Sequence, residues 1–124
     1  ADFGYIGSAF IATQEAAADE RYKQCIVDHN ADDIVYTNLF TGVHGNYLKP
    51  SIDAAGMDSN DLPESDPSKM SFGTSGSEKS KAWKDIWGCG QGIGAVKEVL
   101  PAGELVARLA REYENAKTRL LANS

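Results

Sequence analysis

Tyr5-Ile6-Gly7-Ser8 is the stretch of this chain best suited to bind a phosphate group. We expect Ala1 to Ile6 to form a strand that ends in a glycine-serine corner and leads into a helix. A glycine leaves the backbone N–H groups around it unshielded by a Cβ, and the serine adds a hydroxyl group. The corner therefore predicts a phosphate site at the carboxyl edge of a sheet, and an ordinary turn is the alternative.

A second glycine-rich block, Gly90-Gln91-Gly92-Ile93-Gly94-Ala95, fits the G-x-G-x-x-A pattern of dinucleotide-binding proteins. That pattern carries meaning only between a strand and a helix of a βαβ unit. The preceding residues Lys81 to Trp87 are more helical than extended in character, so we interpret the block as a loop-to-helix junction. Gln91 then either points its amide toward a ligand pocket or caps the helix.

The histidines and cysteines are expected to be structural. His29 falls on the inner face of a predicted helix, where a packed or capping imidazole is the default, and His44 lies in an exposed glycine-flanked turn. Cys25 and Cys89 match no metal-ligand spacing, which predicts reduced, buried thiols in a cytoplasmic protein.

Charge and hydropathy exclude several classes of partner. The 124 residues carry a net charge of -6 without a basic patch, which argues against nucleic acid and anionic membranes as partners. No apolar run approaches the roughly 20 residues of a membrane-spanning helix. The carboxylates of the central loop lack the regular spacing of a calcium loop, so we expect no metal site and a set of solvated side chains: Asp53, Asp58, Asp61, Glu64 and Asp66.

Residues 1–55 are expected to hold the strand, a helix and an extended segment. Thr13 is a suitable N-cap for a helix that ends at Asn30. Ile34 to Thr37 has the β-branched and aromatic character of a short strand, and Tyr47 to Ala55 predicts a short helix closed by Gly56. The inner face of the first helix is predicted to consist of Ala18, Tyr22, Cys25, Ile26 and His29.

Residues 56–80 predict a loop-rich connection and residues 81–124 a set of C-terminal helices. Short helices are expected over Lys79–Trp87 and Gln91–Val99, with Trp83 and Trp87 packed together one turn apart. The last helix is expected from Pro101 to Leu121. Its apolar face is predicted to consist of Leu105, Leu109, Tyr113, Ala116 and Leu120, and a charge ladder to consist of Glu104, Arg108 and Glu112.

A lone N-terminal strand has unpaired backbone groups, so we expect this chain to be the C-terminal piece of a larger α/β protein. Three blocks resemble, in the same order, the nitronate monooxygenase family, formerly called 2-nitropropane dioxygenases. The first is Ala1 to Glu15, similar to the family's Gly-Thr-Arg-Phe and Ala-Thr-Glu run at the end of the barrel. The other two are Thr37-Asn38-Leu39-Phe40-Thr41-Gly42 and Trp87-Gly88-Cys89-Gly90-Gln91-Gly92-Ile93-Gly94.

The resemblance implies an FMN-dependent (β/α)8, or TIM, barrel oxidoreductase that oxidises alkyl nitronates with dioxygen. As the C-terminal fragment of such a barrel, this chain would be mostly helical with one or two short strands. The remainder of the barrel would complete it, and the fragment would be inactive alone. Tyr5, Ile6, Gly7 and Ser8 would lie on the FMN phosphate, with Gln91 near the flavin or substrate. No catalytic residue is carried over, because the family's histidine belongs to an earlier part of the barrel.

The chain departs from the family at two places. Ala9 stands where the family usually has an arginine, and Val43-His44-Gly45-Asn46 stands where an Arg-Pro-Ala-Arg run is common. Two other functions therefore stay open. One is a flavin-dependent enoyl-acyl-carrier reductase, which shares the phosphate corner; the other is a non-enzymatic module whose last helix binds a partner or a second copy of the chain.

Overall fold

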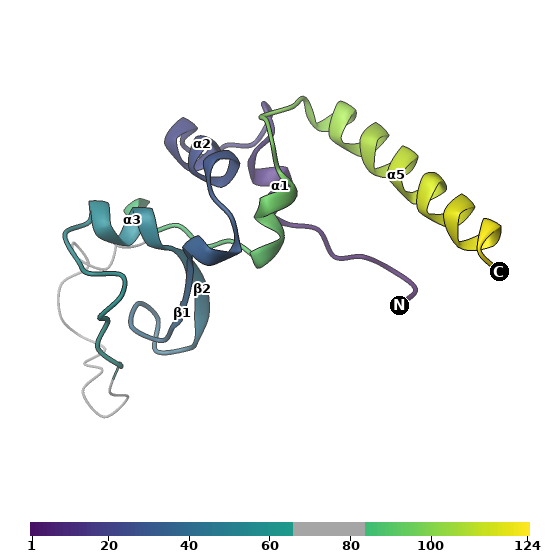
Figure 1. Ribbon diagram of the computed structural model, residues 1–124. Coiled ribbons are helices and arrows are strands. Elements are labelled where there is room, and N and C mark those ends of the chain that lie inside the picture. Colours follow the sequence, from purple (N-terminus) through teal and green to yellow (C-terminus); the bar gives the residue numbers. More distant parts are fainter. Residues whose placement is uncertain (66–83) are drawn as a thin grey trace.

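The computed structural model describes residues 1–65 and 84–124, and places several short elements around a small core (Figure 1). The helices of the first half are α1 (Ser8–Ile11), α2 (Glu20–Asp28) and α3 (Lys49–Ala54), with a 3-10 turn η1 (Ala31–Asp33). Strands β1 (Ile34–Thr37) and β2 (Gly45–Leu48) follow η1. The second half contributes a 3-10 helix η3 (Gln91–Ala95) and the long helix α5 (Ala102–Ala122).

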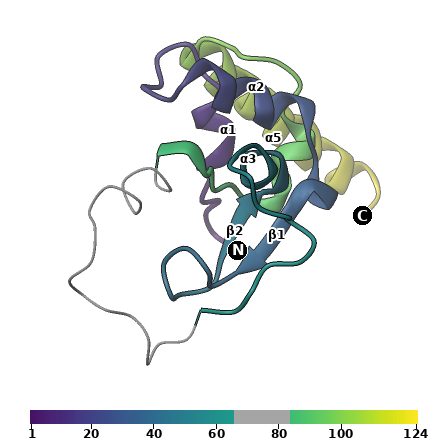
Figure 2. The same cartoon turned by 90° about the vertical axis from the view of Figure 1, so that its left-hand side faces the viewer.

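The sheet is an antiparallel hairpin in which Ile34 pairs with Leu48 and Thr37 with Gly45. Residues 87–89 run along β2, because Leu48 N–H donates to the Trp87 carbonyl at 2.8 Å and Cys89 N–H donates to the Asn46 carbonyl at 3.3 Å. Helix α2 lies above the hairpin in both views (Figures 1 and 2). The buried core between these segments consists of Ala12, Cys25, Ile26, Leu48, Cys89, Ile93 and Val96.

Three local predictions are confirmed. The strand over Ile34 to Thr37 forms as β1, and the short helix before Gly56 forms as α3 with Pro50 in its first turn, although its predicted first residues Tyr47 and Leu48 belong to β2. Gly56 has a φ of 88°, a left-handed conformation that favours glycine after a helix. The last helix forms over Ala102–Ala122, close to the predicted limits.

The helix predicted to start at Thr13 is wrong at its N-terminus. α2 begins at Glu20, where the Asp19 side chain accepts a hydrogen bond from the Arg21 N–H. Thr13 instead forms an isolated parallel bridge with Leu100, and its hydroxyl donates to the Phe10 carbonyl at 2.7 Å. The predicted helix over Gln91–Val99 is also wrong in length, because only the five residues of η3 are helical and Gly92 and Gly94 weaken the α conformation.

The segment before α1 is extended and exposed. Phe3 and Tyr5 expose nearly all of their side chains, and residues 1–7 belong to no strand of the described part. The final barrel strand that we expected here has no partner strand among the described residues, so it stays a prediction. Of the helix predicted over Lys79–Trp87, Lys84 and Asp85 are helical and Trp87 is not, while residues 79–83 lie outside the described residues, as do the Trp83 contact and part of the 56–80 connection.

α5 extends away from the rest of the molecule (Figure 1). Leu105, in its first turn, is its one buried residue. Its start is held by backbone pairs between Leu100 and the segment after α1: Gln14 N–H donates to the Leu100 carbonyl at 2.9 Å. The Ala102 N–H also donates to Glu15 Oε2 at 2.7 Å, so a distant carboxylate caps the helix.

Candidate functional site

The glycine-serine corner lies at the start of α1. Gly7 is the N-cap of this helix, and no side chain caps its first turn. α1 is a single turn of four residues, in which the Phe10 N–H donates to the Gly7 carbonyl at 3.0 Å. A Cβ built on Gly7 would meet no atom within 4 Å, so the backbone here is open to an approaching group.

Ser8 connects this corner to the second glycine-rich block. The Gly90 N–H donates to Ser8 Oγ at 2.7 Å across 82 residues of sequence. The Ser8 hydroxyl accepts this bond and therefore still has its own proton to donate to another group. Gln91 follows Gly90 directly and opens η3 with an exposed side chain, so the structure brings Gly7, Ser8 and Gln91 into one region.

Tyr5 and Ile6 do not join this cluster. Both lie in the exposed N-terminal arm, where the Tyr5 side chain has no covering residue in the described part of the chain. Of the four corner residues, Ser8 thus contacts the residue before Gln91, while Tyr5 and Ile6 lie in the exposed arm.

Close approach explains the glycine at position 88, just before the second block, but not the glycines of the block itself, since a Cβ on Gly92 would meet no atom within 4 Å. A Cβ on Gly88 would lie 3.2 Å from the Asn46 carbonyl oxygen, because Gly88 forms a bridge with Tyr47 of β2. A Cβ on Gly90 would lie 3.5 Å from Ser8 Oγ. The block enters a 3-10 helix, which supports the loop-to-helix interpretation over a dinucleotide fingerprint.

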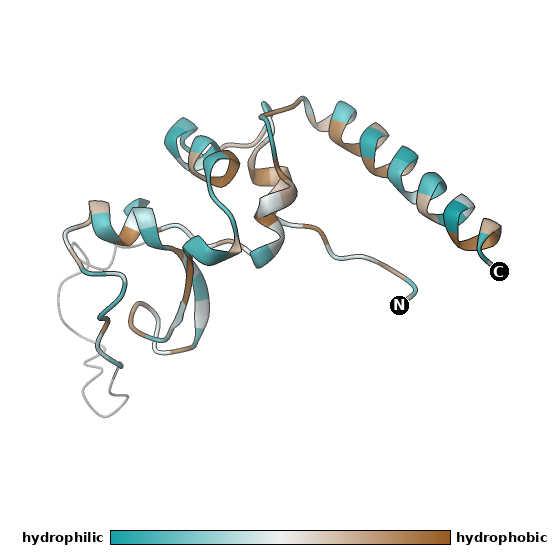
Figure 3. Ribbon diagram, viewed as in Figure 1, coloured by the Kyte–Doolittle hydropathy of each residue, from teal (hydrophilic) through white to brown (hydrophobic). Residues whose placement is uncertain are grey.

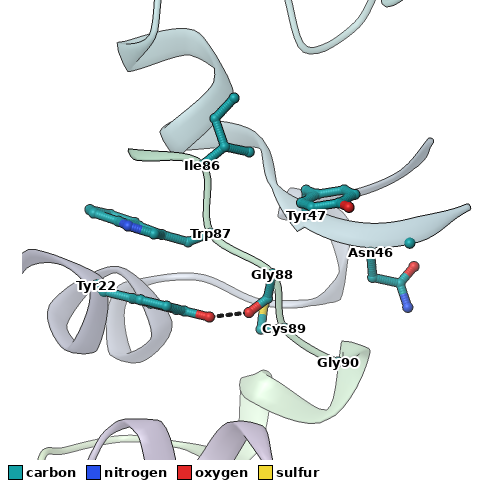
Figure 4. Close-up of a pocket in the computed structure, with 9 residues that line it drawn as sticks. Tyr22, Asn46, Tyr47, Ile86, Trp87, Gly88, Cys89 and Gly90 are labelled. Carbon is teal, nitrogen blue, oxygen red and sulfur yellow. Dashed lines mark hydrogen bonds between the residues drawn. The ribbon is translucent and has the colours of Figure 1, made fainter. Parts of the chain in front are cut away.

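A pocket of about 530 Å³ borders this region and is open to solvent. Figure 4 shows the Tyr22 and Trp87 rings facing each other on one of its sides. Their centroids are 5.1 Å apart with an interplanar angle of 6°, and the Tyr22 hydroxyl donates to the Gly88 carbonyl. The pocket is lined by Tyr22, Gly45, Asn46, Tyr47, Ile86, Trp87, Gly88, Cys89 and Gly90.

Tyr22 and Cys89, which line the pocket, are both neutral at pH 7. Burial raises the pKa of Tyr22 to about 12 and the pKa of Cys89 to about 11. Burial also raises the pKa of Cys25, which like Cys89 is a free, buried thiol as predicted. Because the thiolate is the nucleophilic form, these cysteines are unsuited to nucleophilic catalysis.

Both histidines occupy structural positions, as predicted. His29 is the C-cap of α2, and its Nδ1 donates to the Cys25 carbonyl at 2.7 Å. The exposed His44 ring stacks on Tyr36 at a centroid distance of 4.7 Å. Neither histidine lines the pocket.

The loop carboxylates cap turns of their own chain. Asp53 Oδ1 accepts the Ser59 N–H at 2.9 Å, and Asp58 Oδ1 accepts the Asn60 N–H at 3.0 Å. Within residues 1–65 and 84–124, no group of three or more potential metal ligands is found.

Sequence reasoning missed two parts of this site. It did not pair Ser8 with the Gly90 N–H, and it did not predict the stacking of Trp87 on Tyr22. The spacing of glycines after Trp87 was a signal that this backbone lies close to another segment, but it does not identify that segment.

Comparisons with protein-family models, with curated proteins and with solved structures found no match to this chain. In the described ranges, none of the helices has both the length and the apolar content required to cross a bilayer.

Proposed function

We propose that this chain supplies the flavin-phosphate corner of an FMN-dependent oxidoreductase of the nitronate monooxygenase type, as the C-terminal part of a (β/α)8 barrel. The observation that carries the proposal is the hydrogen bond from the Gly90 N–H to Ser8 Oγ. It joins two of the three sequence blocks on which the resemblance rests. A chance resemblance gives no reason for these two blocks to meet.

The corner fits a phosphate in its donor groups. The Ser8 hydroxyl and the open backbone at Gly7 are neutral donors of the kind that hold phosphate oxygens. Residues 1–15 contain no lysine or arginine, and their only charged side chains are Asp2 and Glu15. Phosphate binding at this corner therefore relies on hydrogen bonds and is expected to depend weakly on salt.

FMN would supply the redox chemistry, with an alkyl nitronate and dioxygen as substrates. In this proposal Gly7 and Ser8 hold the phosphate, and the exposed Gln91 lies beside them and extends toward the flavin or substrate. The base and the contacts to the flavin ring belong to the remainder of the barrel. We also propose a cytoplasmic location, which the two free thiols support.

Flavin binding by the full-length parent tests the phosphate corner. Equilibrium dialysis should show that Gly7→Val weakens FMN binding more than about tenfold, since the new side chain fills the open approach to the backbone. Riboflavin, which lacks the phosphate, should bind native protein and variant equally. Gly103→Val in α5 is the matched control, because its Cβ also meets no atom within 4 Å. Equal FMN affinities for native protein and Gly7→Val would refute the proposal.

The reaction is tested separately. Oxygen uptake with an alkyl nitronate is expected from the full-length parent, and none from residues 1–124 alone. NAD(P)H oxidation with an enoyl thioester, in place of oxygen uptake, would instead identify the enoyl reductase alternative.

One observation favours the non-enzymatic alternative. Several large apolar side chains of α5 are exposed, which is typical of a helix that binds another protein surface. If the full-length parent binds neither FMN nor riboflavin, this function replaces the enzymatic one.

A further inference from the structure

We propose that α5 forms an antiparallel coiled coil with α5 of a second copy of this chain. The evidence begins with the apolar spacing of the helix. Apolar residues recur at alternating steps of four and three, which is the a/d repeat of a two-helix seam. They are Ala102, Val106, Leu109, Tyr113, Ala116 and Leu120.

This seam is uncovered in the single chain. Val106, Tyr113 and Leu120 have relative exposures of 55%, 66% and 75%. Hydrophobic segments recur along one side of α5 as it leaves the body (Figure 3). Leu105, which the body buries, lies beside the seam and not in it, so the body and a partner helix can contact α5 together.

A strict 3.5-residue repeat indicates a helix as the occupant. Helices that pack on a globular body have a wider apolar face, with three to four apolar positions in two turns. In α5 the positions flanking the second half of the seam are charged: Glu112, Lys117 and Arg119. Charged flanks around a narrow apolar seam are the pattern of coiled-coil partners.

One antiparallel register matches the sizes of the facing seam side chains and the charges of the side chains that flank them. In this register the seam pairs over Leu109 to Leu120: Tyr113 faces Ala116 of the second copy, and Leu109 faces Leu120, so a large ring packs over a small seam residue. Val106 lies opposite Asn123, at the end of the paired stretch. The same register places Glu112 of each chain beside Arg119 of the other, so this ion pair occurs twice. Glu112 Oε1 lies 3.4 Å from Arg108 Nε in its own chain, which leaves Oε2 free for Arg119.

A parallel pair is less favourable. It would place Tyr113 against Tyr113 and Ala116 against Ala116, which makes the seam alternately too wide and too narrow. It would also bring both bodies to the same end, since the body attaches at the N-terminal turn of α5, while paired helix axes lie only about 8–10 Å apart. The antiparallel arrangement places the bodies at opposite ends.

Sedimentation velocity on the reduced 124-residue chain tests the proposal. The chain should be a concentration-dependent dimer at protein concentrations up to about 100 μM. Leu120→Glu, which places a charge in the seam, should weaken dimerisation at least about a hundredfold. Leu121→Glu is the matched control: Leu121 is 68% exposed and lies in the same turn, outside the seam. Far-UV circular dichroism on both variants verifies that α5 stays helical.

A charge exchange tests the register. Glu112→Arg and Arg119→Glu should each weaken the dimer about three- to tenfold, and the double variant should recover most of the loss. A monomer at every concentration, or equal effects of Leu120→Glu and Leu121→Glu, would overturn the proposal. A dimer in which the double variant is weaker than both single variants would overturn the antiparallel register. If α5 instead contacts the remainder of a barrel, the 124-residue chain is monomeric.

Discussion

Removing the Glu15 side chain should loosen the attachment of α5 to the body. The Ala102 N–H at the start of α5 donates to Glu15 Oε2 at 2.7 Å, and 87 residues separate the two partners. Pro101 supplies no side-chain cap for this helix. The carboxylate therefore satisfies an N–H group that the helix cannot satisfy itself, and it places a negative charge at the positive end of the helix dipole.

The magnitude follows from these two contributions. A hydrogen bond to a charged group contributes about 1.5–3 kcal/mol when well formed, and solvent exposure of Glu15 reduces this value. The interaction with the helix dipole contributes about 0.3–1 kcal/mol. We expect Glu15→Met, which keeps the length of the side chain but removes its acceptor, to lower the free energy of unfolding by about 1–2 kcal/mol.

Glu104→Met is the matched control. Glu104 lies in the first turn of the same helix, is exposed, and makes no side-chain hydrogen bond to any residue of the described ranges. Its replacement removes the same charge near the same dipole and should cost no more than about 0.5 kcal/mol. Urea unfolding followed by circular dichroism gives both values, and amide exchange at Ala102 reports the local effect. Equal losses for the two variants would refute a specific cap by Glu15.

Three further outcomes follow from buried side chains. Lys23 is 2% exposed, and its Nζ lies 3.2 Å from the exposed Glu20 carboxylate, so the packing of its buried stem should contribute more to stability than its charge. In urea unfolding, Lys23→Met should lower the free energy of unfolding by less than about 1 kcal/mol, and Lys23→Ala by more than about 2 kcal/mol. Equal costs for the two would contradict this. Cys25 and Cys89 should stay unmodified by a thiol reagent at pH 8 in the folded chain, because burial raises the pKa of each thiol, and should both react in urea. Rapid labelling without urea would show that the core opens. Burial raises the pKa of Tyr22 to about 12, so the folded chain keeps a proton that the unfolded chain loses near pH 10. This contribution to stability is complete below about pH 10 and is lost between about pH 10 and 12. Tyr22→Phe should therefore make the free energy of unfolding less sensitive to pH in that window. An unchanged pH profile would contradict the raised pKa of Tyr22.

The sequence correctly predicted those helices and strands that depend on the preferences of a few neighbouring residues. The β-branched run at Ile34 forms β1, the left-handed Gly56 ends α3, and Pro101 precedes the helix that begins at Ala102. Each of these depends on the conformational preference of one or a few neighbouring residues. They could be located to within a residue or two without knowledge of the rest of the chain.

Local residue preferences alone permit two starting points for α2. Thr13 and Asp19 are both good N-cap residues, and the alanines between them are strong helix formers. The choice depends on distant contacts, since Thr13 and Gln14 are held by Leu100, and the Gln14 carbonyl lies 3.4 Å from the buried Lys23 Nζ. Extended backbone at this point therefore gains partners that a helix there would lose.

The candidate site depends on local residue types at one point and on distant contacts at another. The open backbone at Gly7 and the Ser8 hydroxyl follow from residue types alone, so the sequence could predict donors at this corner. The Gly90 N–H reaches Ser8 only because residues 87–89 pair with β2 and the following turn brings Gly90 back toward α1. Gly88 permits that pairing, since a side chain there would press on the Asn46 carbonyl at 3.2 Å. Any change that displaces residues 87–89 from β2 should therefore also remove the Gly90 donor from Ser8, and the phosphate corner depends on the hairpin as much as on its own residues.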